Sequence, residues 1–165
     1  VFDAPIIGQI ATAMGGIRVD RGTGSDEPLL AAAEALSVGE MVAIMPQGTI
    51  PRGRAFFDPL LKGKWGAARL AAHVRVPVIP IGLWGTEDVW PRNSRLPNVL
   101  NIAKPPLVRV TVGSPVALAY DDVDADTTRI MNAIMNLLPD ESRWRVEPTE
   151  EQIRRASPPP KKTSK

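Results

Sequence analysis

The side chains best suited to chemistry lie in a loop that follows the apolar run 41–45. Within eight residues this loop holds a glycine, a hydroxyl group and two arginines. Gly48 lets the backbone approach a ligand closely, and Thr49 with free backbone N–H groups would form an anion-binding concavity. Arg52 and, as a secondary candidate, Arg54 would add positive charge. The alternative is a Pro- and Gly-rich turn whose arginines point to water. The glycine-lysine-hydroxyl ending of a Walker loop is absent.

A second candidate is an arginine at the end of a short predicted strand over residues 17–20. Arg21 follows this strand, and Arg18 lies within it as a secondary candidate. A guanidinium held at a rigid strand end can grip a phosphate through two parallel hydrogen bonds. The alternative is an ordinary strand end with a surface salt bridge between Asp20 and Arg21, which would contribute little.

A third segment of interest is the apolar stretch 76–81. It contains Pro77 and Pro80, and each proline removes a donor from a strand ladder. The segment therefore predicts either an edge or bulged strand, or a stiff wall beside an apolar cleft.

Helical and strand patterns alternate along the chain, which predicts an α/β domain with a mixed, mostly parallel sheet flanked by helices. In such sheets ligands bind beyond the carboxyl ends of the strands, where the loop after residue 45 begins. Thr149 and Gln152 are spaced as a helix capping box. The predicted helices are 5–14, 26–36, 65–74, 126–138 and 148–156, and the predicted strands are 17–20, 41–45, 77–81 and 107–112.

Composition excludes several classes of function. The 165 residues are 44% hydrophobic, enough for one domain core. Twenty basic and eighteen acidic residues give a net charge of +2, and this near-balance argues against a nucleic-acid partner. Cysteine is absent, so disulfides, thiolate nucleophiles and Cys-type zinc sites are excluded. No apolar run reaches the roughly 18 residues of a membrane span, and the first residues do not form a signal peptide.

The three segments, in this order and spacing, resemble three of the four sequence blocks of the glycerolipid acyltransferase family. Residues 16–21 match its second block, a glycine, apolar residues and a terminal arginine. Residues 45–49 match the third, Phe-Pro-Glu-Gly-Thr-Arg-Ser, and residues 76–80 match the Val-Pro-Ile-Pro type of the fourth. The resemblance covers roughly residues 1–120. The joint match is specific, although no single block is.

The resemblance implies transfer of a fatty acyl group from acyl-CoA or acyl-carrier protein to lysophosphatidate or a related acceptor. No metal and no cofactor is expected beyond the acyl thioester co-substrate. It also implies a cytoplasmic location with peripheral contact at the inner face of the membrane. The residues expected at the acceptor's phosphate are Arg21, Gln47, Gly48, Thr49 and Arg52, with Arg18 and Arg54 as secondary candidates.

The chain departs from the family pattern at its most important residues. The family's first block, a histidine followed five residues later by an aspartate, supplies the general base, and this pair is absent. The only histidine, His73, stands on the wrong side of the pattern, and we interpret it as a surface or boundary residue. Gln47 replaces the glutamate of the third block, and Ile50 replaces its arginine, so Arg52 or Arg54 would have to substitute.

Two interpretations of function remain open. The chain is the phosphate-binding part of an acyltransferase whose catalytic residues are expected upstream of Val1, or it is a non-catalytic module that binds lipid phosphates. We expect residues 1–139 to form an N-terminally truncated acyltransferase domain, and residues 140–165 a C-terminal extension with a disordered Pro- and Lys-rich tail. The aromatic residues Phe56, Phe57, Trp84 and Trp90 would contact lipid or, as we favour, complete a small core under long loops.

The absence of a general base generates a first prediction. We expect the purified chain to show no transferase turnover, because no residue is placed to deprotonate the acceptor hydroxyl. Release of free thiol from acyl-CoA in the presence of lysophosphatidate measures this directly. Measurable acyl transfer by the chain would contradict it.

Overall fold

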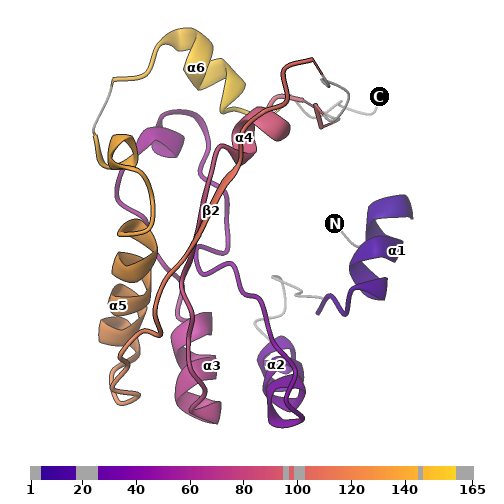
Figure 1. Ribbon diagram of the computed structural model, residues 1–165, viewed down its shortest axis with the longest axis vertical. Coiled ribbons are helices and arrows are strands. Elements are labelled where there is room, and N and C mark those ends of the chain that lie inside the picture. The colour runs from indigo at the N-terminus through magenta and orange to yellow at the C-terminus, as the bar shows by residue number, and fades with distance from the viewer. Residues whose placement is uncertain (1–4, 18–25, 95–96, 99–102, 145–146, 159–165) are drawn as a thin grey trace, which may run out of the picture.

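The computed structural model describes residues 5–17, 26–94, 97–98, 103–144 and 147–158 (Figure 1). Helices predominate in these ranges, and two short strands run between them. The elements in chain order are α1 (Pro5–Ala13), α2 (Glu27–Ser37), the 3-10 turn η1 (Gly53–Phe57), α3 (Gly66–Val74), β1 (Ile81–Trp84), α4 (Thr86–Val89), β2 (Arg109–Val112), α5 (Val123–Met135), the 3-10 turn η2 (Asp140–Arg143) and α6 (Glu150–Arg155).

Helix α3 lies between α2 and α5 and contacts both (Figure 1). Its buried face is made of Ala68, Leu70 and Ala71, and small side chains let neighbouring helices approach closely. On the α2 side, Ala32 and Ala33 form a core cluster with Leu70. This packing makes α3 the central helix of the described structure.

Strands β1 and β2 pair antiparallel, with Ile81 opposite Val112 and Trp84 opposite Arg109. One face of this pair lies against the residues that follow α5. A Cβ placed on Gly82 would lie 2.9 Å from Leu137 Cβ, so only glycine permits this approach. Leu83, on the opposite face, is exposed.

The helix predictions are confirmed, with one shift in position. Helices α1, α2, α3 and α6 fall within the predicted ranges to within about a residue at most ends. The capping box of α6 is present, with Thr149 and Gln152 bonded reciprocally. Helix α5 starts and ends three residues earlier than predicted, because the carboxylate of Asp122 accepts the amides of Asp124 and Ala125 and so begins the helix there.

The strand predictions are only partly confirmed. Residues 41–45 were expected to be a buried strand, and this is wrong: they form no ladder and Met41 is 97% exposed. An apolar run of this kind needs neighbours on both faces, and the described two-stranded sheet supplies none. The predicted strand 17–20 lies almost wholly outside the described residues. A mostly parallel sheet therefore stays a prediction.

The two prolines before β1 explain why that strand is shorter than the predicted 77–81. Pro77 and Pro80 have no N–H to donate, so regular pairing begins only at Ile81. Residues 113–116, which follow β2, nevertheless donate two hydrogen bonds to carbonyl groups of the segment before β1. Gly113 N donates to Pro80 O at 3.0 Å, and Val116 N donates to Val78 O at 2.9 Å. The prediction of an edge-like or bulged strand is thus close to what is observed.

Asp126 is the most deeply buried ionisable side chain described, only 1% exposed. Its carboxylate accepts the backbone amides of Ala119 at 3.0 Å and Tyr120 at 2.7 Å, and an Arg129 N–H at 2.5 Å. Burial by itself raises the pKa of Asp126, but these two amides and the Arg129 guanidinium outweigh it and lower the pKa below its ordinary value. The carboxylate therefore fastens the segment before α5 onto the helix.

We predict that Asp126→Ala lowers the free energy of unfolding by about 2–4 kcal/mol, because two amides and a guanidinium lose their acceptor. A pKa lowered in the folded state contributes stability above the unfolded-state pKa, and this is lost as pH falls through the folded-state value. Urea unfolding between pH 3 and pH 7 should therefore show a steeper acid loss for the wild type than for Asp126→Asn. Equal pH profiles would contradict the assignment.

Candidate functional site

Residues 45–48 form a tight turn directly after the apolar run. Gly48 N donates to Met45 O at 3.0 Å and closes the turn. Gly48 has a φ of +65°, in the left-handed region that glycine occupies without steric cost. Gln47 and Thr49 flank it on either side. The structure thus places the predicted residues Gln47 and Gly48 in this turn, with Thr49 directly after it.

A second segment holds this turn against the rest of the molecule. Lys64 N donates to Pro46 O at 2.7 Å, which joins the turn to the residues just before α3. Gly63, the preceding residue, lies against α5: a Cβ there would be 2.7 Å from Met131 Cγ and 2.8 Å from Thr127 Cγ2. The turn is therefore positioned by α5 through the segment 63–64.

The same segment leads into the N-terminus of α3, which no side chain caps. Trp65 is the N-cap residue, and its indole N–H donates instead to Asp124 Oδ1 at 2.7 Å. The space around Gly66 is open, since a Cβ built there would meet nothing within 4 Å. The first-turn amides of a helix have no acceptor within the helix and carry a partial positive charge. Helix α3 therefore begins two residues after the lysine whose backbone N–H donates to the turn.

The predicted arginines do not all belong to this turn. Arg54, in η1, forms an ion pair with Glu147, and Gly53 N donates to Ala156 O at 3.2 Å. The segment 52–54 is thus held by residues around α6. The side chain of Arg52 is exposed at the start of η1. Arg18 and Arg21 lie outside the described residues.

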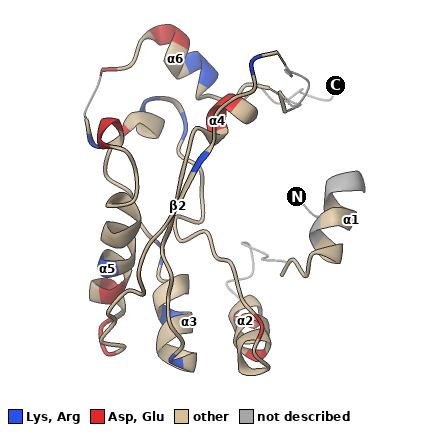
Figure 2. Ribbon diagram, in the orientation of Figure 1, with Lys and Arg blue, Asp and Glu red and all other residues tan. Residues whose placement is uncertain are grey.

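The sequence-based prediction did not include Lys64. A Cβ on Gly48 would lie 3.3 Å from Lys64 Cγ, so the side chain of this lysine contacts the glycine. The available signal was the position of Lys64 directly after Gly63 and just before a predicted helix. Figure 2 shows Lys and Arg scattered over several elements rather than gathered on one face, so overall charge could not have identified this residue.

His73 lies in the last turn of α3 and is exposed. It is seven residues beyond Gly66, which is about 10 Å along the helix axis at 1.5 Å per residue. It therefore lies at the opposite end of α3 from the turn. This position agrees with its interpretation as a surface histidine.

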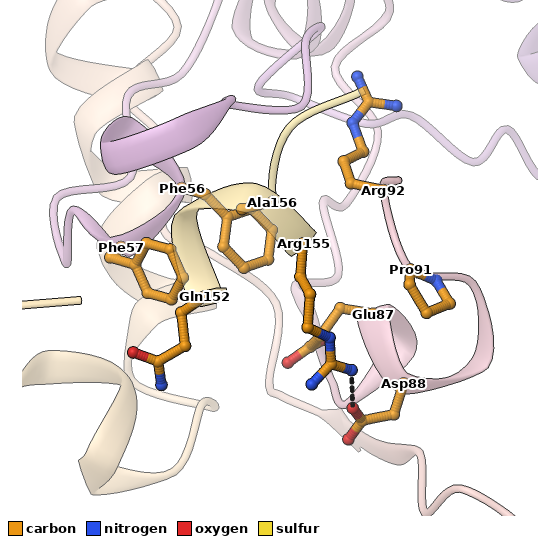
Figure 3. A pocket seen from close by; sticks show the side chains of 9 residues that line it. All are labelled: Phe56, Phe57, Glu87, Asp88, Pro91, Arg92, Gln152, Arg155 and Ala156. Atoms are coloured by element: carbon orange, nitrogen blue, oxygen red, sulfur yellow. Dashed lines mark ion pairs between the residues drawn. The ribbon is translucent and has the colours of Figure 1, made fainter. Parts of the chain in front are cut away.

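A small pocket of about 130 Å³ lies where α6 meets η1 and α4 (Figure 3). Phe56 and Phe57 form part of its wall and pack edge to face, with ring centroids 5.3 Å apart. Arg155 points toward Asp88 across the pocket, and 3.9 Å separates Arg155 Nη2 from Asp88 Oδ1. Phe56 and Phe57 are only half-buried, so their place in a small core under long loops stays a prediction.

Comparison with known proteins defines the class to which this architecture belongs. The family model described as Acyltransferase matches residues 1–84, which include the turn at Gly48, Lys64 and the start of the sheet. The chain belongs to this acyltransferase family. No curated protein and no solved structure matches it significantly. None of the helices in the described ranges is long and apolar enough to cross a membrane.

The two glycines at this site generate a matched pair of predictions. We expect Gly48→Ala to lower the free energy of unfolding by about 1–2 kcal/mol, because φ is positive and the Lys64 stem obstructs the new Cβ. Gly66→Ala should instead be neutral or stabilising by up to about 1 kcal/mol, because the site is helical and open. Urea denaturation of both variants measures the difference, and similar effects of the two would contradict this geometry.

Proposed function

We propose that this chain supplies the acceptor-binding part of an enzyme that transfers a fatty acyl group from acyl-CoA or acyl-carrier protein to lysophosphatidate or a related glycerolipid. The turn with Gln47, Gly48 and Thr49 would hold the acceptor's phosphate. The observation that supports this proposal most is the hydrogen bond from Lys64 N to Pro46 O, which joins that turn to the residues just before the uncapped N-terminus of α3. Family membership supports acyl transfer as the reaction.

The chemistry of the turn suits an anion better than a neutral group. The side-chain amide of Gln47 and the hydroxyl of Thr49 are donors that carry no charge of their own. Uncapped helix amides favour phosphate through their partial positive charge. These groups would bind and orient the acceptor, so that its free hydroxyl is presented at a fixed distance from the phosphate. A lipid acceptor also implies peripheral contact with the inner face of the membrane.

A second candidate function is a non-catalytic module that binds lipid phosphates. It is favoured by Gln47, which stands where the family carries a glutamate, and by the position of His73 at the far end of α3. The histidine of this chain is therefore not placed as a general base beside the turn. Both candidates require the same phosphate site.

We predict that the chain binds hexanoyl lysophosphatidate more tightly than hexanoyl glycerol, because the two ligands differ only in the phosphate. Calorimetric titration below the micelle concentration measures both affinities. The melting temperature should rise with the phosphorylated ligand, since saturation at 100 Kd adds about 2.7 kcal/mol to the free energy of unfolding.

The neutral ligand serves as the control for binding through the acyl chain alone. Equal affinities for the two ligands would remove the phosphate site. No binding of either would remove the proposed function altogether.

A further inference from the structure

We propose that Lys64 supplies the positive charge that binds the acceptor's phosphate at the turn around Gly48. This inference rests on the proposed function and adds to it the residue on which phosphate affinity depends. Four consecutive residues in and directly after the turn, from Gln47 to Ile50, carry no charge. A phosphate held there needs a cation from another segment.

Two contacts join Lys64 to the turn. Its backbone N–H donates to Pro46 O at 2.7 Å. Its side chain then contacts Gly48, since Cγ lies 3.3 Å from the place of a Cβ on that glycine. The first part of the Lys64 side chain is thus in contact with the turn. Two further carbons, Cδ and Cε, would let the ammonium reach a phosphate bound there.

The ammonium of Lys64 is available for a ligand. The residue is exposed, and in the described part of the chain its ammonium has no ion pair or hydrogen bond. A lysine ammonium is a compact point charge with three donors and binds phosphate in many proteins. Lys64 therefore combines contact with the turn and an unengaged charge.

The other nearby cations meet these two conditions less well. Arg54 is exposed but already paired with Glu147. Arg52 precedes Gly53, whose amide is bound to Ala156. Lys62 is also exposed, but it lies two residues before the contact that Lys64 makes with the turn, about 6–7 Å along an extended chain.

Lys62 provides a matched control, because it has the same charge in the same loop. We expect Lys64→Met to weaken binding of hexanoyl lysophosphatidate and of inorganic phosphate by about 10- to 100-fold, the range of a charged hydrogen bond. Lys62→Met should change either affinity by less than about 3-fold. Lys64→Arg keeps the charge and should restore most of the affinity. Titration calorimetry of the four proteins measures these values.

A second measurement uses the unmodified protein and does not depend on how the variants fold. Acetylation of lysines with acetic anhydride, read by mass spectrometry, should slow at Lys64 when hexanoyl lysophosphatidate saturates the chain. The rate at Lys62 should change little. Protection of neither lysine would remove Lys64 from the site.

The outcomes separate this inference from the proposed function. If the wild type binds the phosphorylated ligand and Lys64→Met binds equally well, the role of Lys64 is wrong and the phosphate site stands. Equal losses in Lys64→Met and Lys62→Met would also overturn it, because the effect would then be general electrostatic attraction. If the wild type binds no phosphate, both proposals fall together.

Discussion

Close approach of glycines to α5 and the residues after it is the constraint on which the described structure depends. Gly63, Gly82 and Gly113 come from three separate segments, and a Cβ on each would lie 2.7 to 3.2 Å from the nearest atom of α5 or of Leu137. Side chains of any size would push these segments outward. The turn at Gly48 depends on this packing indirectly, because Gly63 precedes the residue that hydrogen-bonds to Pro46. The backbone of the site is thus set by α5, although α5 contributes no residue to it.

The sequence predicted the helices well because their signals are local. Alanine-rich faces and the Thr149–Gln152 capping box act within one or two turns of helix. The conformation of residues 41–45 could not be predicted in the same way, and the expected strand there is not formed. An apolar run shows that a segment tolerates burial, but it does not show what covers the segment. The start of α5 was missed for a smaller reason. Asp122 competes as a cap with nearby aspartates, and only the folded backbone shows which carboxylate accepts the first amides.

In the candidate site, too, residues adjacent in sequence could be predicted, whereas contacts between distant residues could not. Gln47, Gly48 and Thr49 are consecutive, so their joint presence in a turn could be predicted from their types. The arginines could not be assigned, because the partner of Arg54 is Glu147, 93 residues further along the chain. The importance of Lys64 was hidden for a related reason. Its contact with Gly48 spans 16 residues, and it depends on the long loop returning to the turn before α3 begins.

The residues around α6 limit which positively charged side chain could bind a phosphate at the turn. Glu147 engages Arg54, and Ala156 accepts the amide of Gly53, so residues before and after α6 both hold the loop at η1. A guanidinium engaged by a carboxylate would have to break that ion pair before it could bind phosphate. A surface pair of this kind contributes less than about 1 kcal/mol, but the backbone bond at Gly53 restrains the same segment independently. Lys64 has neither restraint, and its Cγ already contacts the turn at Gly48. Positive charge at this site therefore comes most readily from the residue that also fixes the turn in place.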